Sequence, residues 1–339
     1  MDIITFSQQA RNYLQNCDPA ITGQLIDANL LQWQAKRKHR KTSAWLYETL
    51  LRHASRGTGK GDALGKWYQP RTEAADTAPT LYLRDYLAPI LFNFNPQQVA
   101  ATYGKEPKKV WQALGGKKNL KELLAPDGKA PQKKTIKAWK NFVQIICDAA
   151  VFFAGDDQYK AFKSALSDAH GDDVNALLVP VELLHEAIPS LDKGLVYNFI
   201  KELGYTDYVK PDASLINLCM RAGLVDLKQV QQRMQKKPKT LPKAPKKDKK
   251  INYAKVVCPQ KFFTTIVTLC KDKGILPYEF DKLMWLVDSG KFIEPDGRLR
   301  EFKTSKKDFI AQCLVNEAIN AEKLRHGKKP KQPLKKPAA

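Results

Sequence analysis

Apolar residues recur along most of this chain with the spacing of an amphipathic α-helix. Residues 42–52 bring Trp45, Leu46 and Leu50 to one face, and residues 137–153 are apolar nearly all round, as expected of a helix inside a hydrophobic core. Strand-like alternation is scarce. Further helices are expected near residues 4–16, 81–92, 107–114, 157–167, 174–187, 194–203, 213–222, 260–273, 279–288 and 307–324. The pattern predicts an all-α protein.

Two basic segments interrupt this helical pattern. Residues 236–250 hold eight lysines and three prolines against one acid, Asp248. The prolines exclude a continuous helix, and repulsion between like charges extends the chain. The tail from Lys323 to the end carries seven basic residues and no acid. We expect a flexible linker and a disordered tail, and we favour phosphate-contacting arms over plain solvated lysine runs.

These features divide the chain into five predicted regions. An N-terminal helical region covers residues 1–130, and a helical core covers residues 131–235. The lysine- and proline-rich linker, residues 236–251, separates this core from C-terminal helices at residues 252–322 that complete it. The basic tail is residues 323–339.

The charge indicates the kind of partner. A formal net charge of +22 attracts polyanions, and each DNA phosphate that is neutralised releases condensed counterions. No apolar run reaches the ~18 residues that a membrane-spanning helix needs. We expect double-stranded DNA as the partner, no membrane association and a monomer. Residues 36–41, which are all Lys, Arg or His, are either a DNA contact or an exposed link between two helices.

Cysteine and histidine spacing gives no sign of a metal centre. The six cysteines lie far apart and the five histidines are isolated, so we expect no metal and no other cofactor. Acidic pairs at residues 156–157 and 172–173 are better explained as helix caps than as the magnesium ligands of a nuclease. Most cysteines lie among apolar neighbours, and the N-terminus lacks the features of a secretory signal. The expected location is the cytoplasm, with the nucleoid.

Residues 183–225 predict a helical hairpin followed by a third helix. The first helix ends before a tight connection at residues 188–192, and a second helix opens at Lys193. Gly204 ends that helix, as a C-terminal glycine does. A loop then leads to Asp212, which directly precedes the third helix.

This order of elements resembles the helix-hairpin-helix superfamily of DNA glycosylases over about residues 180–290. Members carry a hairpin, a helix and a loop ending in an aspartate that opens the next helix, and in many a lysine at the start of the hairpin's second helix is the nucleophile. Lys193 and Asp212 match these two positions, 19 residues apart, and residues 274–286 look like a late helix of relatives. The resemblance implies a glycosylase-like helical bundle.

The sequence also departs from the family pattern, as a divergent member would. Its connection reads Ile-Pro-Ser-Leu-Asp at residues 188–192, without the usual glycines that let backbone amides approach a DNA phosphate. The family aspartate is usually followed by one residue and then a histidine, whereas Ala213 and Ser214 follow here. The cysteine cluster that holds an iron–sulfur group in some members is absent from the sequence.

The resemblance implies a DNA glycosylase that hydrolyses an N-glycosidic bond, in base-excision repair or in antiviral defence against phage with modified DNA. Asp212 would stabilise the positive charge that develops on the sugar, and a desolvated Lys193 would attack C1′ and add AP-lyase chemistry. The target base would be flipped into a pocket. Candidate pocket aromatics are Tyr197, Tyr205, Tyr208 and Trp285. Candidate DNA contacts are Ser190, Gly194, Lys201 and Lys210.

Each of these assignments has a structural alternative. Asp212 could serve only as a helix N-cap, worth ~1 kcal/mol, and Lys193 could be a solvated surface lysine. Lys201 and Lys210 could be plain surface groups, and Trp285 a core residue. For the whole protein, the alternative is a non-enzymatic DNA-binding protein built on a helix-hairpin-helix scaffold.

Overall fold

The computed structural model describes residues 1–37, 42–56, 83–115, 133–155, 157–169, 173–231 and 252–326. These residues are mostly helical, which confirms the predicted helical class, and they include one short two-stranded antiparallel sheet. Within these ranges no helix is long and apolar enough to cross a membrane. The predicted linker, residues 236–251, lies outside the described residues, and so does the tail beyond residue 326.

The chain forms two compact units whose limits differ from the predicted regions. Unit 1 combines Met1–Leu31 with Pro211–Ala339, and unit 2 is Gln32–Lys210. The predicted boundary at residue 130 therefore lies inside unit 2. The physical reason is that the first two helices bury their apolar faces against C-terminal helices and not against their neighbours in the sequence.

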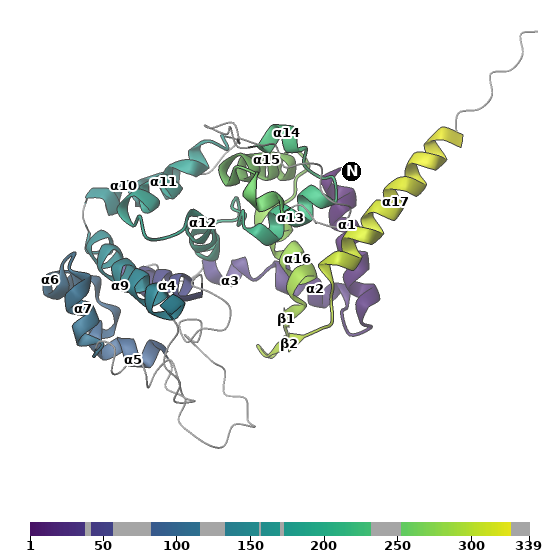
Figure 1. Cartoon of the computed structure of the whole chain (residues 1–339). Coiled ribbons are helices and arrows are strands. Elements are labelled where there is room, and N and C mark those ends of the chain that lie inside the picture. The colour runs from purple at the N-terminus through teal and green to yellow at the C-terminus, as the bar shows by residue number, and fades with distance from the viewer. Residues whose placement is uncertain are drawn as a thin grey trace, which may run out of the picture. The chain divides into compact units, whose positions relative to one another are not determined.

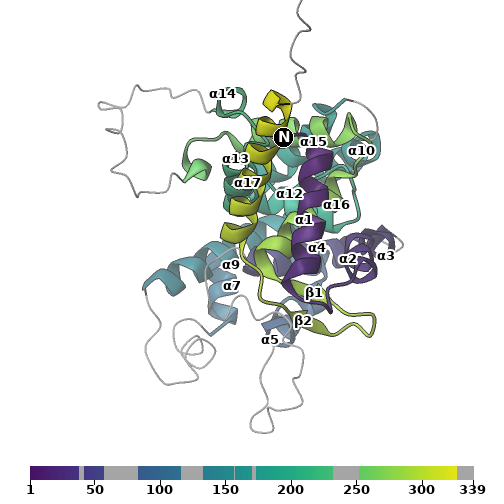
Figure 2. The same ribbon diagram turned by 90° about the vertical axis from the view of Figure 1, so that its right-hand side faces the viewer.

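Unit 1 is built around the helices at the two ends of the chain. Its elements are α1 (Ile3–Cys17), α2 (Gly23–Leu30), α13 (Ala213–Arg221), α14 (Leu227–Val230), η4 (Tyr253–Lys255), α15 (Pro259–Lys271), α16 (Pro277–Ser289), β1 (Lys291–Ile293), β2 (Leu299–Glu301) and α17 (Lys306–His326). Helix α1 packs against α16 and α17 (Figures 1 and 2). Residues 323–326, predicted as part of the disordered tail, belong to α17.

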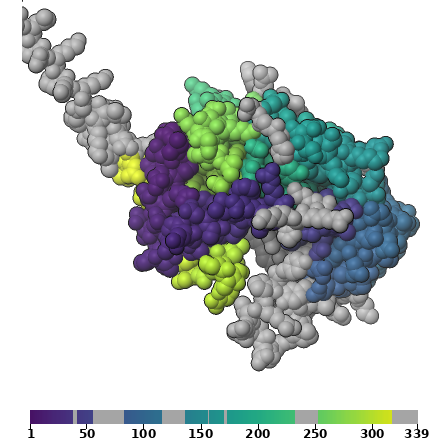
Figure 3. Space-filling model, turned by 180° about the vertical axis from the view of Figure 1, so that it is seen from behind, coloured from purple at the N-terminus to yellow at the C-terminus, as the bar shows by residue number. Residues whose placement is uncertain are grey.

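Aromatic and polar contacts fasten the two chain ends within unit 1. The Phe6 ring lies 6.2 Å from Phe280 of α16 and 5.3 Å from Phe309 of α17, between ring centroids. The buried Asn29 amide donates to the Ile293 carbonyl at 3.0 Å and accepts from its N–H at 2.9 Å, which holds β1 against α2. From behind, the purple surface of the first helices borders the yellow-green surface of the C-terminal segment (Figure 3).

Unit 2 is organised around one long helix. Its elements are α3 (Trp33–Arg37), α4 (Ser43–Arg56), α5 (Leu83–Ile90), η2 (Phe92–Phe94), α6 (Pro96–Tyr103), α7 (Pro107–Ala113), α9 (Lys133–Phe153), α10 (Asp157–Asp168), η3 (Ala176–Leu178), α11 (Val179–Ala187) and α12 (Lys193–Glu202). Helices α4, α6 and α7 pack on α9, and α12 packs on α4 and α11. Trp139 and Phe142 of α9 are fully buried, which confirms the predicted core helix.

Candidate functional site

The helical hairpin of unit 2 has the predicted limits. Helices α11 and α12 are joined by residues 188–192, and Gly204 follows α12 with a φ of +90°. Asp192 caps α12, because its Oδ1 accepts from the Gly194 N–H at 2.8 Å. The turn is also fastened from α9, where Asn141 Nδ2 donates to the Ser190 carbonyl at 3.1 Å. These contacts hold the turn at residues 188–192 in place without glycine.

The hairpin carries an unfavourable charge for a DNA phosphate. Asp192 is exposed at the turn, beside the predicted phosphate contacts Ser190 and Gly194. Residues 173–210 hold six carboxylates and three lysines. The carboxylates are Asp173, Glu182, Glu186, Asp192, Glu202 and Asp207, and the lysines are Lys193, Lys201 and Lys210. The formal charge of residues 173–210 is therefore −3, and the exposed Asp192 carboxylate would repel a DNA phosphate at the turn.

Lys193 opens α12 as predicted, and its ammonium group is held in an ion pair. Its Nζ donates to both carboxylate oxygens of Glu182 on α11, at 2.7 and 2.6 Å. The Lys193 side chain is 39% exposed. A nucleophilic lysine is desolvated and able to lose its proton. Lys193 is a half-buried lysine whose ammonium group is engaged by both oxygens of Glu182.

Lys201, predicted to contact phosphate, is a buried side chain. It is 7% exposed, and its Nζ lies 3.8 Å from Glu202. Glu202 also pairs with Lys36 of α3, one of the basic residues 36–41. Burial raises the pKa of Glu202, but Lys36 and Lys201 outweigh burial and hold it well below its usual range. The phosphate contact at Lys201 is therefore corrected to an internal ion pair, while Lys210 is half-buried.

Two of the predicted pocket aromatics belong to the core of unit 2. Tyr197 and Tyr208 are fully buried, and the Tyr208 hydroxyl donates to the Leu177 carbonyl at 2.9 Å. Their burial prevents them from stacking on a flipped base, so this prediction is corrected. Tyr205 is half-buried and meets the Tyr208 ring edge-to-face, with ring centroids 6.5 Å apart.

Trp285 of unit 1 is the most exposed of the four predicted aromatics. Its side chain is 39% exposed on α16, so it is not a core residue. Lys282, one turn earlier, places its Nζ 4.1 Å from the centre of the indole ring. The ammonium group lies over one face of this partly exposed indole ring, as a cation–π contact.

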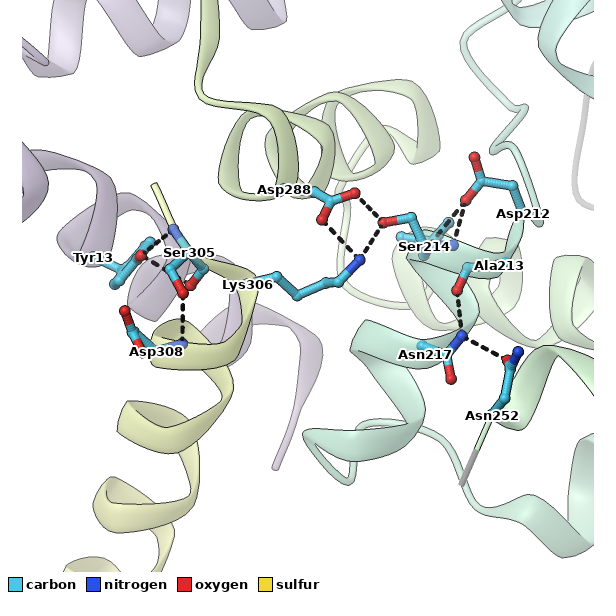
Figure 4. A network of polar contacts seen from close by, with 11 residues as sticks. Tyr13, Asp212, Ala213, Ser214, Asn217, Asn252, Asp288, Ser305, Lys306 and Asp308 are labelled. Carbon is cyan, nitrogen blue, oxygen red and sulfur yellow. Dashed lines mark hydrogen bonds and ion pairs between the residues drawn. The ribbon is translucent and has the colours of Figure 1, made fainter. Parts of the chain in front are cut away.

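Asp212 caps α13 in unit 1, as the structural alternative predicts. Its Oδ1 accepts from the Ser214 N–H at 2.9 Å and from the Leu215 N–H at 3.0 Å (Figure 4). Both amides bind the same oxygen of a half-buried carboxylate. The carboxylate is thereby fixed at the positive end of α13. A cap of this kind is compatible with a catalytic role, because one carboxylate can serve both.

An ion pair from two other helices binds the residue that holds Asp212. Ser214 Oγ donates to Asp288 Oδ2 at the end of α16 and accepts from Lys306 Nζ of α17 at 2.9 Å. Lys306 Nζ also lies 2.7 Å from Asp288 Oδ1 (Figure 4). Sequence reasoning missed this cluster. Its one signal was the departure at Ser214, where the family pattern has a histidine.

Further polar contacts surround the first turn of α13. Asn217 Nδ2 donates to the Ala213 carbonyl at 2.6 Å and to Asn252 Oδ1 at 3.0 Å. The Tyr13 hydroxyl donates to the Ser305 carbonyl at 2.9 Å and accepts from its N–H at 2.7 Å. Burial raises the pKa of Tyr13 to about 12. These contacts fasten the segment after the linker and the start of α17 (Figure 4).

The described residues hold no group of three or more His, Cys, Asp or Glu that could bind a metal ion. Asp157 of the predicted caps lies in the first turn of α10, whereas residues 156 and 172 lie outside the described residues. The buried thiols predicted from the sequence are confirmed for four cysteines. These are Cys147, Cys219, Cys270 and Cys313.

The two catalytic candidates belong to different units, Lys193 to unit 2 and Asp212 to unit 1. Comparison of the chain with known protein families, curated proteins and solved structures found no match. The resemblance of residues 180–290 to the glycosylase superfamily stays a prediction from the sequence.

Proposed function

We propose that this chain is a DNA glycosylase that removes a modified base from double-stranded DNA, with Asp212 as the catalytic carboxylate. The observation that carries the proposal is the setting of Asp212. It caps α13 directly after the α11–α12 hairpin and the loop that follows it, in the order that the family resemblance requires. Two backbone amides hold one of its oxygens, so the carboxylate is fixed in advance of the reaction.

The chemistry needs one fixed negative charge beside the sugar. When the N-glycosidic bond breaks, its electron pair leaves with the base, and positive charge develops at C1′ and the ring oxygen. A carboxylate held close by stabilises that charge. Water then bonds to C1′ and gives up a proton, and the departing base takes up a proton. Asp212 would supply both the charge and the acceptor that orients the water.

Contact with DNA rests on charge and on one exposed aromatic ring. Most of the +22 net charge comes from residues 236–250 and the tail from Lys323, which would neutralise phosphates. Trp285 would stack on the flipped base. It stands one turn before Asp288 on α16, and Asp288 binds Ser214, two residues after Asp212.

Lys193 has no covalent step in this proposal. Its ammonium group is paired with Glu182, and its side chain is 39% exposed. We therefore expect hydrolytic release of the base, which leaves an abasic site without strand cleavage. Borohydride reduction during turnover should trap no adduct between the chain and DNA.

The decisive test compares Asp212→Asn with the wild type on duplexes carrying oxidised guanine, alkylated purines or glucosylated hydroxymethylcytosine. Asparagine caps helices about as well as aspartate, so this variant keeps the cap and loses the charge. Base release should fall by at least about 100-fold while DNA affinity and thermal stability are retained. Asp226→Asn, at the exposed cap of α14, is the matched control and should release base at the wild-type rate.

Two outcomes would overturn the proposal. One is base release that survives in Asp212→Asn, and the other is no release from any duplex of the panel. Tight, salt-sensitive binding without release would support the second candidate, a DNA-binding protein without enzymatic activity. The paired state of Lys193 favours that candidate, since a scaffold role explains the pair without chemistry.

A further inference from the structure

The cap at Asp212 is built differently from three other aspartate caps of the described helices. Asp2, Asp192 and Asp226 also accept from the N–H two residues later. Those later residues are the exposed Ile4, Gly194 without a side chain, and the exposed Lys228. At Asp212 the equivalent residue is Ser214, and its hydroxyl is bound by the Asp288–Lys306 ion pair.

Helix capping alone does not require this cluster. The cap uses the backbone N–H of Ser214, and any residue other than proline supplies one. The side chains of Lys306 and Asp288 are 30% and 31% exposed, and an ion pair with this exposure contributes only about 0–1 kcal/mol to stability. The cluster therefore does more for the position of Ser214 than for the stability of the fold.

We propose that Ser214, Asp288 and Lys306 form a positioning relay for Asp212. Lys306 and Asp288 hold the Ser214 hydroxyl, which fixes the backbone of the first turn of α13. That turn aims the N–H groups of Ser214 and Leu215 at Asp212 Oδ1 (Figure 4). The inference rests on the proposed function, because positioning matters only if Asp212 reacts.

The charges of the relay suit the reaction at Asp212. A lone ammonium group near this carboxylate would oppose the positive charge that develops on the sugar. Asp288, 2.7 Å from Lys306, neutralises that ammonium. The relay can thus fix the carboxylate without cancelling its charge. Small errors of position are costly in such a site, since about 1 Å of misplacement can cost about 100-fold in rate.

The test uses Lys306→Met and Ser214→Ala, with Lys307→Met as the matched control. Lys307 is the next residue of α17, is exposed and carries the same charge. In the two relay variants kcat for base release should fall about 10- to 100-fold. KM and DNA affinity should stay at their wild-type values. Lys306→Arg and Ser214→Thr, which keep the bonding groups, should recover most of the loss.

If the wild type releases base, either of two results would overturn the proposed relay. These are an unchanged kcat in Lys306→Met and Ser214→Ala, and an equal loss in Lys307→Met, which would trace the effect to general charge. If the wild type releases no base, the proposed function fails, and amide exchange decides the relay. Exchange at Ser214 and Leu215 should be faster in Lys306→Met than in Lys307→Met, and equal rates would overturn the relay.

Discussion

Two helices of this chain combine an aspartate cap with a nearby lysine–carboxylate pair, and they use the pair differently. At α12 in unit 2, Asp192 is the cap and Lys193 pairs with Glu182 on the neighbouring α11. That pair does not involve Gly194, the residue whose amide the cap uses. At α13 in unit 1, the pair of Lys306 and Asp288 binds the side chain of the residue that holds the cap.

The difference shows that a pair of opposite charges beside a cap is not in itself a sign of catalysis. At α12 the lysine, its partner and the cap lie within 11 residues of each other, so local packing accounts for them. At α13 the partners come from 74 and 92 residues away, and they converge on one hydroxyl. The α13 cap is therefore the better candidate for a functional carboxylate.

The largest expected effect is a difference in base release between variants of the two capping aspartates. Asp212→Asn should lose base release by at least about 100-fold, whereas Asp192→Asn should keep the wild-type kcat. Both variants retain a capping side chain, so both should melt near the wild-type temperature. Single-turnover base release and thermal melting measure the two properties. Equal losses of activity would remove the functional difference between the caps.

The next largest effect is the pH-dependent contribution of Glu202, at the end of α12, to the stability of the fold. The pKa of Glu202 is raised by burial but held well below its usual range by Lys36 and Lys201. Ionised Glu202 thus stabilises the fold above its unfolded pKa of ~4.3, and this stabilisation is lost as pH falls through the lower folded value. Lys36→Met should lower the free energy of unfolding by about 1–3 kcal/mol at pH 7, because Glu202 loses one of its two cationic partners.

Urea titrations at pH 7 and pH 3 measure this effect. The difference in unfolding free energy between the wild type and Lys36→Met should shrink at the lower pH, because Glu202 of the unfolded chain, with a pKa of ~4.3, is largely protonated at pH 3. If the difference in unfolding free energy is the same at pH 7 and pH 3, the ion pair between Lys36 and Glu202 does not contribute to stability.

A smaller effect is expected when each cap is removed outright. Asp212→Ala and Asp192→Ala should each lower the free energy of unfolding by about 0.5–2 kcal/mol. The loss should be greater at Asp212, because its Oδ1 accepts from two amides where that of Asp192 accepts from one. Urea titration at neutral pH measures both values. A greater loss at Asp192 would contradict this account of the caps.

The smallest effect is expected at the pair beside the α12 cap. Glu182→Gln removes the carboxylate that binds Lys193, whose side chain is 39% exposed, so stability should change by less than about 1 kcal/mol. Base release should not change. A borohydride-trapped adduct in Glu182→Gln, absent in the wild type, would show that the pair restrains a nucleophilic lysine.

Features set by neighbours in the sequence were predictable. The core helix α9, the hairpin limits at residues 187 and 193, and Asp212 as a cap follow from apolar period and capping residues. Such features depend on contacts a few residues apart. The short β1–β2 sheet was not expected, because strands of three residues leave too little alternation to detect.

Features set by distant residues were not predictable. The division into units depends on the packing of α1 against α16 and α17. The sequence of one chain does not show which distant helices pack together. The relay needs Asp288 and Lys306 beside Ser214 for the same reason. Tyr197 and Tyr208 were predicted to line a pocket because their residue type suits stacking. Both are buried because of how the helices around them pack, and this cannot be read from the residue type.

The make-up of unit 1 also has a consequence for synthesis of the chain on the ribosome. Met1–Leu31 is made long before the rest of its unit, which begins at Pro211. At about 5–20 residues per second, α1 and α2 are complete roughly 12–50 s before synthesis of α16, the helix on which both pack, begins. Unit 2, which is continuous, can fold during that interval. Phe6 and Ile26, which are buried in the finished unit, lack their covering helix during that interval, so Met1–Leu31 then offers apolar side chains to which a chaperone could bind.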